Sequence, residues 1–540
     1  MSRPGRRVRN EVRRIPCSSE PPRTDPPRGL TVAAALAADD AAKSTPAPPL
    51  TADQTDALNR ISADSLRGHL SFLASDLLEG RDTPSRGLDV AAEYIAAQFR
   101  RAGLEPAGDD GYFQTAVWKI TEPDAPSFTL TLKAGETTLN VPKERVSLRW
   151  AGPIDVPPAG LVKVDVKDEG GLEKLGKNPP AGKALVVEFA EPKDPSDMEA
   201  RRTASLQRMA LLVKLRAMKP ALILAVGRQA SEATGLTGSM LIDPDRPGSA
   251  GFRGSVLGPP VVTVHDPKAV ALLDKLPEGA TVEAHMGEPV TRPVKLRNVA
   301  GLLRGSDPKL KDTYVLVTAH YDHIGVGSAV GGDSIYNGAN DDGSGTVSVV
   351  EVASALGSLK QRPARSILFL TFFGEEKGLL GSRHYGRHPL VPVFKTVADV
   401  NLEQVGRTDS SEGPQVNAAS MTGFDFSEVG TIFQAAGEAE GVKVFKHPRN
   451  SDAFFGRSDN QALADLGVPA HTLCVAYVYP DYHGAADHWD KVDYANMARI
   501  DRVVARALLA IASNPEPPRW NEANPKAKRY REAYQKLIGK

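Results

Sequence analysis

The stretch Tyr314-Val315-Leu316-Val317-Thr318-Ala319-His320-Tyr321-Asp322 joins an almost continuous apolar run to a histidine and an aspartate. A second apolar run, Ile367–Phe373, leads in the same way into Glu375-Glu376. Both runs are short enough to be strands that are buried on both faces. Ligands of open α/β sheets bind at the carboxyl ends of the strands, so polar residues at these positions are informative.

The chain after Arg297 repeats the order strand, loop, helix. Val397–Leu402 and Ala470–Ala476 are further strand candidates, and the helical pattern Thr346–Leu359 opens after Gly343-Ser344-Gly345. Alternating strands and helices predict an α/β fold with a mostly parallel central sheet and helices on both faces.

Acidic and imidazole side chains fall where the predicted strands end or in the loop before the helix. Nitrogen and carboxylate ligands suit divalent cations such as zinc. Two histidines and three carboxylates can hold two zinc ions if one carboxylate bridges them. Thiolate ligands are excluded in practice, because the chain has only two cysteines. The groups at these positions are His320 and Asp322, Asp341 and Asp342, Glu375 and Glu376, Glu403, and His483.

Each of these groups also has a simpler interpretation. Asn340-Asp341-Asp342-Gly343 consists of turn-forming residues and could be only a tight turn. Glu375-Glu376 would ordinarily be a solvated pair of charges. His384, His388 and His488 could be ligands by composition, but we interpret them as surface residues. The ordered occurrence of all the candidate groups at predicted strand ends favours a metal site.

Composition limits the classes of partner. Lys plus Arg equals Asp plus Glu, at 66 each, so no charge excess points to nucleic acid or to an anionic membrane. No apolar run approaches the ~18 residues of a membrane span. A chain of 540 residues exceeds what one hydrophobic core usually supports, which predicts two folded domains with tails.

The first fifty residues differ from the rest of the chain. They contain eight arginines and many prolines, followed by the Ala-rich apolar stretch Leu30–Ala38. A basic region, a short apolar segment and small residues are the parts of a secretory signal. We therefore expect export to the periplasm or the extracellular space, with a disordered head on a cytoplasmic protein as the alternative.

A Gly- and Pro-rich segment precedes the strand–helix repeat. It contains isolated strand-like runs at Ala184–Val187, Ala221–Val226 and Val261–Val264 and one amphipathic helix, Ala204–Met218. These features predict a small inserted α/β domain without catalytic residues of its own. The predicted divisions are a basic head at 1–50, the N-terminal part of a peptidase domain at 51–150, the insert at 151–290, the catalytic domain at 291–515 and a tail at 516–540.

The ordered motifs resemble the zinc exopeptidase family that includes bacterial leucyl aminopeptidases, glutamate carboxypeptidase and the transferrin receptor. The resemblance covers roughly 51–110 and 295–515, and the insert looks like the protease-associated domain of many members. The motifs are Ala319-His320-Tyr321-Asp322-His323, Gly338-Ala339-Asn340-Asp341-Asp342-Gly343-Ser344-Gly345, Phe373-Gly374-Glu375-Glu376, Asn401-Leu402-Glu403 and Asp481-Tyr482-His483.

The resemblance implies two zinc ions, and it assigns a residue of this chain to each metal-ligand position of the family. His320 and Glu403 would bind one ion, and Glu376 and His483 would bind the other. Asp341 would bridge them. Many aminopeptidases of the family have Asp where this chain has Glu403, which weakens the inference about which end of a peptide is attacked.

The resemblance also implies two residues that act beside the metals. Asp322 would orient His320. Glu375 would be the general base that takes a proton from the attacking water and delivers it to the leaving amine. The expected activity is that of an aminopeptidase on peptide substrates. A carboxypeptidase or dipeptidase on the same scaffold, and a non-catalytic receptor-like module, are the alternatives.

Overall fold

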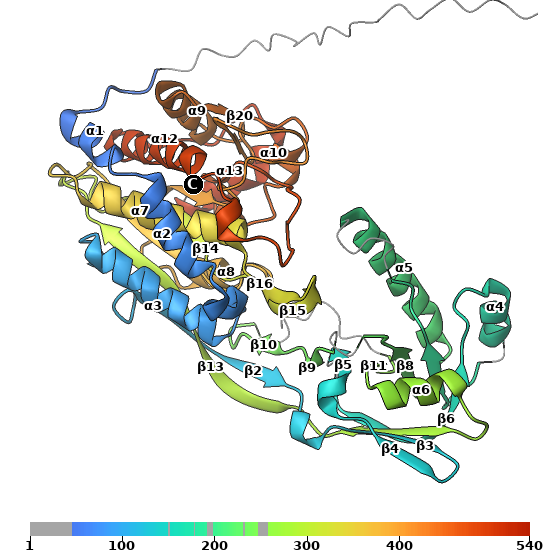
Figure 1. The fold of residues 1–540 in the computed structure, drawn as a ribbon. Helices are drawn as coiled ribbons and strands as arrows, with labels where there is room; N and C mark the ends of the chain where they lie inside the picture. The colour runs from blue at the N-terminus through green and yellow to red at the C-terminus, as the bar shows by residue number, and fades with distance from the viewer. Residues whose placement is uncertain are drawn as a thin grey trace, which may run out of the picture. The chain divides into compact units, whose positions relative to one another are not determined.

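Most of the chain after the basic head is described by a computed structural model (Figure 1). The predicted signal region lies outside the described residues. In the described part of the chain, no helix combines the length and the hydropathy of a membrane span. The described residues are 46–149, 152–177, 179–191, 198–229, 233–246 and 258–539.

A large mixed sheet forms the centre of the fold, and the predicted α/β class is confirmed. Strands β17, β14, β18 and β21 pair in parallel, while the pairs β10–β2, β2–β13 and β13–β17 are antiparallel. In spatial order the strands are β10 (Met240–Ile242), β2 (Phe113–Glu122), β13 (Val290–Leu303), β17 (Ser366–Phe372), β14 (Tyr314–His320), β18 (Thr396–Leu402), β21 (Ala470–Cys474), β19 (Ala418–Met421) and β20 (Lys443–Phe445), with β1 (Glu105–Pro106) paired to β13.

The central strands are buried on both faces, as their apolar runs predicted. Along β14, Val315 and Val317 belong to one hydrophobic cluster, whereas Leu316 belongs to another. This alternation follows from the period of two residues in a strand. The first cluster is covered by α1 (Ala52–Leu58), α2 (Ala63–Leu73), α3 (Arg86–Arg101), α7 (Gly345–Gly357), α9 (Val429–Glu440) and α12 (Tyr494–Ser513), and the second by α8 (Leu380–Arg387), α11 (Asn460–Ala464) and α13 (Lys528–Leu537).

Local sequence signals explain where several helices begin and end. Ser62 and Ser85 accept hydrogen bonds from the backbone of the first turns of α2 and α3. Gly103, just after α3, has a φ of 72°, a conformation that glycine adopts without steric cost. The segment 516–540, which we predicted to be a tail, packs on the second cluster through the buried side chains of Trp520 and Tyr530.

A second sheet is built from the segment between β2 and β13. The three predicted strands correspond to β7, β8 and β11. The predicted helix Ala204–Met218 coincides with the C-terminal part of α5 (Met198–Ala217) and extends one residue beyond it. The predicted boundary at 150/151 falls inside this sheet. In spatial order the strands are β4 (Thr137–Asn140), β3 (Thr129–Ala134), β12 (Thr281–Met286), β6 (Ile154–Lys163), β7 (Ala184–Val187), β8 (Leu222–Val226), β11 (Val261–Val264), β5 (Val146–Arg149) and β9 (Gly235–Thr237), accompanied by α4 (Glu169–Lys177) and α6 (Pro267–Lys275).

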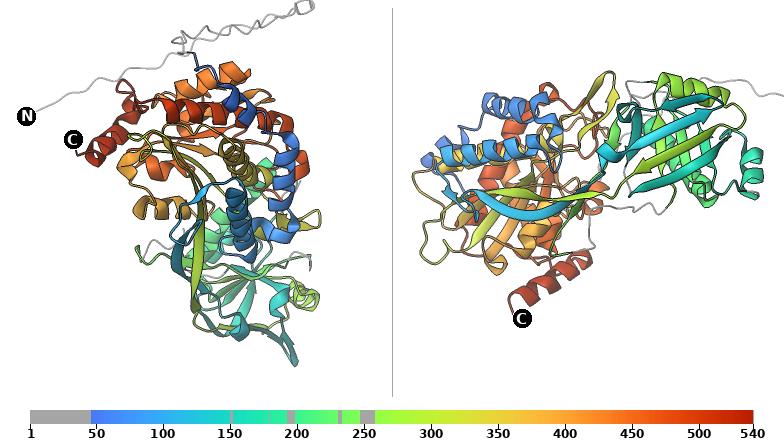
Figure 2. Two further views of the ribbon diagram at one scale, coloured as in Figure 1. Left: turned by 90° about the vertical axis from the view of Figure 1, so that its left-hand side faces the viewer. Right: turned by 90° about the horizontal axis from the view of Figure 1, so that it is seen from below.

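The long strands β2 and β13 frame this segment. They run side by side in antiparallel register, from Phe113 opposite Val299 to Glu122 opposite Val290 (Figure 2, light blue and yellow-green). The chain therefore leaves the central sheet and returns to it at neighbouring positions.

Candidate metal centre

Three neighbouring parallel strands bring most of the predicted site residues to one edge of the sheet. His320 is the last residue of β14, and Glu403 directly follows β18. Glu375 and Glu376 lie just beyond the end of β17. Because β17, β14 and β18 are adjacent and parallel, their carboxyl ends meet at this edge, as the sequence pattern indicated.

Asp341 reaches the same edge from the loop that precedes α7. This loop follows the two-stranded sheet of β15 (Gly325–Val330) and β16 (Asp333–Tyr336). The backbone N–H of Asp341 donates to Asp487 Oδ2 at 3.3 Å, and that of Asn340 donates to the same oxygen at 2.9 Å. The buried Arg81 donates to the carbonyl oxygen of Gly338 at 2.9 Å. The loop is thus fixed from two sides by residues distant in sequence.

One group of potential ligands consists of His320, Asp341 and Glu403, with ligand atoms within 4.8 Å of one another. Nε2 of His320 lies 3.4 Å from Oδ1 of Asp341. That nitrogen is buried and has no hydrogen-bond partner among the described residues. On the other side of the ring, Nδ1 lies 3.2 Å from the carbonyl oxygen of Asp322 and 3.5 Å from its Oδ1. Asp322 therefore holds the ring so that Nε2 faces the group.

A second group consists of His323, Asp341 and Glu376, within the same 4.8 Å limit. Nδ1 of His323 lies 2.7 Å from Glu376 Oε1. His483 also belongs here, because its Nε2 lies 3.0 Å from Asp341 Oδ2 and 3.3 Å from Glu376 Oε2. The predicted residues therefore converge, and the structure adds His323, which the sequence interpretation had left without a role.

The charges of the second group compensate one another. Burial would lower the pKa of His483, but hydrogen bonds to Asp341 and Glu376 raise it to about 10. Burial and the neighbouring Asp341 would raise the pKa of Glu376, but His323 and His483 lower it to about 2. Burial would likewise raise the pKa of Asp341, whereas His320 and His483 lower it. These carboxylates are therefore ionised and available to a cation.

Glu375 lies beside the two groups and belongs to neither. Its Oε2 is 4.0 Å from His320 Nε2, and its backbone N–H donates to Asp322 Oδ1 at 3.0 Å. Burial raises the pKa of Glu375 well above its usual value, and the negative charge of the neighbouring Glu403 raises it further. Burial likewise raises the pKa of Glu403 to about 7. Glu375 is thus a carboxyl group with raised proton affinity at the edge of the site.

Asp342, next to the candidate bridging residue, has a structural role. Its carboxylate accepts hydrogen bonds from the backbone N–H groups of His320, Gly345 and Gln404 at 3.3, 3.0 and 3.2 Å. These three residues lie at the end of β14, at the start of α7 and after β18. Of the two adjacent aspartates, one therefore ties the loops together and the other faces the ligand groups.

One cation close to the predicted motifs, Arg407, is already paired. Arg407 is buried, and its guanidinium donates to Asp409 at 2.7 Å and to Asp481 at 2.9 Å. It also lies over the ring of Tyr479, 5.2 Å from the ring centroid. The guanidinium is therefore engaged by this chain's own carboxylates.

The donor set fits zinc. Imidazole nitrogens and carboxylate oxygens are its common ligands, and two groups that share one carboxylate provide for two neighbouring ions. The buried His320 Nε2 lacks a hydrogen-bond partner in the described part of the chain, and a bound cation would satisfy it.

The ligand groups lie within a region that matches a known family. Residues 298–508 match Peptidase family M28. The M28 match begins in β13 and ends in α12, so it contains every candidate ligand, Asp322 and Glu375.

Curated relatives align over part of their length. The chain is 25% identical to Aminopeptidase YwaD of Bacillus subtilis (strain 168) over 288 residues, which cover 52% of this chain and 58% of YwaD. It is 39% identical over 101 residues to the Vacuolar membrane protease of Colletotrichum graminicola, covering 18% of this chain and 9% of that protein. The chain thus spans little more than half of the first relative and a small part of the second.

Solved structures support the fold. The aminopeptidase from Aneurinibacillus sp. strain AM-1 matches with a TM-score of 0.50 and 19% identity, covering 87% of this chain and 98% of that one. BSAP, a zinc aminopeptidase from Bacillus subtilis, matches with a TM-score of 0.52 and 18% identity, covering 83% and 94%. At these identities the likeness shows the mixed α/β architecture that the two proteins share with this chain.

Proposed function

We propose that this protein is a zinc aminopeptidase that uses two zinc ions to remove the N-terminal residue of peptides. The observation that carries the proposal is the position of Asp341, whose carboxylate belongs to both groups of potential ligands. The M28 match and the names of the aligned aminopeptidases support the same activity.

Each zinc ion has a proposed set of ligands. His320 and Glu403 would hold one ion, Glu376 and His483 would hold the other, and Asp341 would bridge them. When bound, the two ions would polarise the scissile carbonyl and lower the pKa of a water molecule.

His323 is proposed to position Glu376. Its Nδ1 contacts Glu376 Oε1, while Nε2 of His483 faces the other carboxylate oxygen, Oε2. The side chain of His323 is fully buried, whereas that of His483 is 39% exposed. The more accessible imidazole, that of His483, lies between the carboxylates of Asp341 and Glu376 and is the better candidate for a ligand beside the substrate.

Glu375 is proposed as the general base. The hydrogen bond from its backbone to Asp322 fixes its position next to His320. Its carboxylate is free of both ligand groups, so it can accept the proton of the attacking water and then donate it to the leaving amine nitrogen. The raised pKa of Glu375 matches this role, because a base must hold the proton between the two steps.

The carboxylates of the site favour attack from the amino end, and two of the nearby cations are already paired. A carboxypeptidase needs a free guanidinium or ammonium to pair with the terminal carboxylate of its substrate. Arg407 is occupied by Asp409 and Asp481, and Lys377 pairs with Asp82 at 2.9 Å. The site itself is rich in carboxylates, which suit the α-ammonium group of a peptide.

Two further parts of the prediction concern the chain outside the site. We propose that the segment containing the second sheet is a protease-associated domain and that the protein is exported. The strand-rich insert supports the first, and the basic and apolar composition of the first fifty residues supports the second.

The deciding experiment compares hydrolysis of leucine p-nitroanilide with hydrolysis of an N-acetylated dipeptide that has a free carboxylate. The zinc content of the same sample is measured by elemental analysis. We expect cleavage of the anilide and about two zinc ions per chain for the site of Asp341, in addition to any zinc bound elsewhere on the chain. Cleavage of the blocked dipeptide alone would support the carboxypeptidase or dipeptidase alternative, and zinc binding without either cleavage would support the receptor-like alternative.

A further inference from the structure

Two histidines lie one turn apart at the end of helix α8. His384 is in the last turn of the helix and His388 directly follows it. Their ring centroids are 4.8 Å apart. Residues four positions apart share one face of a helix, so the two imidazoles can bind the same partner.

His384 is not the surface residue that its sequence context suggested. Its side chain is 7% exposed and packs against Trp118, with ring centroids 6.2 Å apart. Its Nδ1 is buried and has no hydrogen-bond partner among the described residues. A buried ring nitrogen without a hydrogen-bond partner is a position that a metal ion can satisfy.

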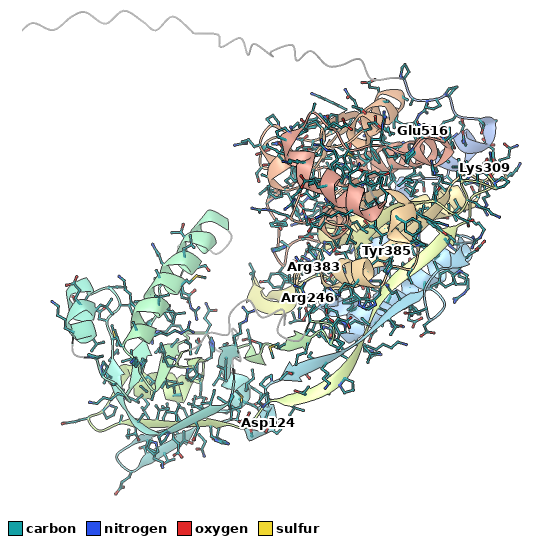
Figure 3. All side chains as sticks on the ribbon, turned by 180° about the vertical axis from the view of Figure 1, so that it is seen from behind. Asp124, Arg246, Lys309, Arg383, Tyr385 and Glu516 are labelled. Carbon is teal, nitrogen blue, oxygen red and sulfur yellow. The ribbon has the colours of Figure 1, made fainter. Side chains whose placement is uncertain are left out.

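A carboxylate from a distant segment meets this pair. Asp245 follows β10, and its Oδ2 lies 2.7 Å from Nε2 of His388. Ligand atoms of Asp245, His384 and His388 all lie within 4.8 Å of one another. In Figure 3 the labels of Arg246 and Arg383, the sequence neighbours of Asp245 and His384, appear close together in this view.

The one arginine within this turn of α8 has its own carboxylate. Arg387 forms an ion pair with Asp243, which also follows β10. The positive charge of Arg387 is thus compensated by Asp243 and not by Asp245. Asp245 remains available to a cation together with the two imidazoles.

We propose that Asp245, His384 and His388 form a further zinc site that fastens the segment after β10 to the end of α8. Two nitrogens and one carboxylate oxygen make a common set of three protein ligands, with water in the fourth position. The cluster shares no residue with the groups around Asp341. It belongs to a helix that begins four residues after Glu376, so it can stabilise the region of the site without touching substrate.

The test compares the zinc content of the full-length protein with that of His388→Ala and Asp245→Ala. The two side chains are 51% and 44% exposed, so neither substitution opens a cavity in the core. We expect each variant to hold about one zinc equivalent less than the unsubstituted protein, or to bind that equivalent more than about tenfold more weakly in a chelator titration. The rate of peptide hydrolysis should not change.

A matched control is Asp333→Ala. Asp333 lies 3.3 Å from the partly exposed His488 and belongs to none of the ligand clusters found in the described residues. This variant should keep the full zinc content. Equal zinc content in all four proteins would overturn the proposal and leave only an ion pair between Asp245 and His388. The comparison does not depend on hydrolysis, so it remains decisive if the protein proves not to be a peptidase.

Discussion

The backbone N–H of Glu375 donates a hydrogen bond of 3.0 Å to Oδ1 of Asp322, the same oxygen that lies 3.5 Å from Nδ1 of His320. A single buried carboxylate thus orients both a proposed ligand and the proposed base. Oδ2 of Asp322 in turn accepts a hydrogen bond from Thr83 at 3.2 Å. The position of the base relative to the ligands is therefore set by the fold and does not depend on flexible side chains.

Glu375→Gln should separate catalysis from metal binding. The amide has nearly the same shape but cannot accept the proton of water, so we expect the rate to fall by about 10²–10⁴-fold. Zinc content should stay unchanged, because Glu375 belongs to neither ligand group. Steady-state hydrolysis and elemental analysis on the same preparation provide the check. Near-normal turnover would show that another group is the base.

Asp341→Ala should remove more zinc than the loss of any other single ligand. Asp341 belongs to both groups, whereas Glu403 belongs to one. We therefore expect Asp341→Ala to lose more than one equivalent and Glu403→Ala to lose one at most. Elemental analysis of the two variants side by side distinguishes them. Equal losses would mean that Asp341 does not bridge.

His323→Gln and His483→Gln test which imidazole is the ligand. If His323 only positions Glu376, its loss should weaken zinc binding by about 10–100-fold. Loss of His483 removes a ligand and should weaken binding further. Competition with a chelator measures both affinities. The opposite order would make His323 the ligand and His483 the supporting residue.

The second sheet should be separable from the central one. Glu122 pairs with Val290, so replacing residues 123–289 by an Asn-Gly turn would join β2 and β13 as a hairpin. We expect a folded protein that cleaves small chromogenic substrates. Its zinc content should equal that of Asp245→Ala, because Asp245 is removed with the segment. An insoluble or zinc-free product would show that the segment is needed to complete the central fold.

Asp501→Asn should change how stability depends on pH. Burial in α12 raises the pKa of Asp501 to about 8 from the usual 3.8. The folded protein therefore keeps a proton that the unfolded chain has lost, so stability falls as pH rises from about 4 to 8, by at most ~1.4 kcal/mol per pH unit. Asparagine does not ionise. The melting temperature of the variant minus that of the unsubstituted protein should therefore increase from pH 5 to pH 8. A difference that does not change with pH would contradict the assignment.

The sequence predicted the parts of the fold that depend on local pattern. Tyr314–Ala319 and Ile367–Phe373 were recognisable as buried strands because both faces of a central parallel strand are apolar. The convergence of His320, Glu376 and Glu403 follows from the same pattern, since parallel neighbours end at one edge.

Other features depend on contacts between distant segments and left no local signal. Arg81 and Asp487 fix the loop of Asp341, but neither belongs to a motif of that loop. His384 was interpreted as a surface residue, and this was wrong, because Trp118 of β2 covers it. The boundary at 150/151 was placed by a change in composition, whereas strand pairing extends the second sheet back to Thr129.

The pairing of Glu122 with Val290 also bears on how the chain assembles during synthesis. Every strand of the second sheet emerges from the ribosome before β13, the long partner of β2, and the short partner β10 also emerges earlier. Closing a long loop costs more entropy than closing a short one. If the second sheet forms first, it holds the ends of its segment close together, so β13 emerges beside β2. The insert would then act as a scaffold for the nascent chain, because its early folding prepares the pairing of β2 with β13.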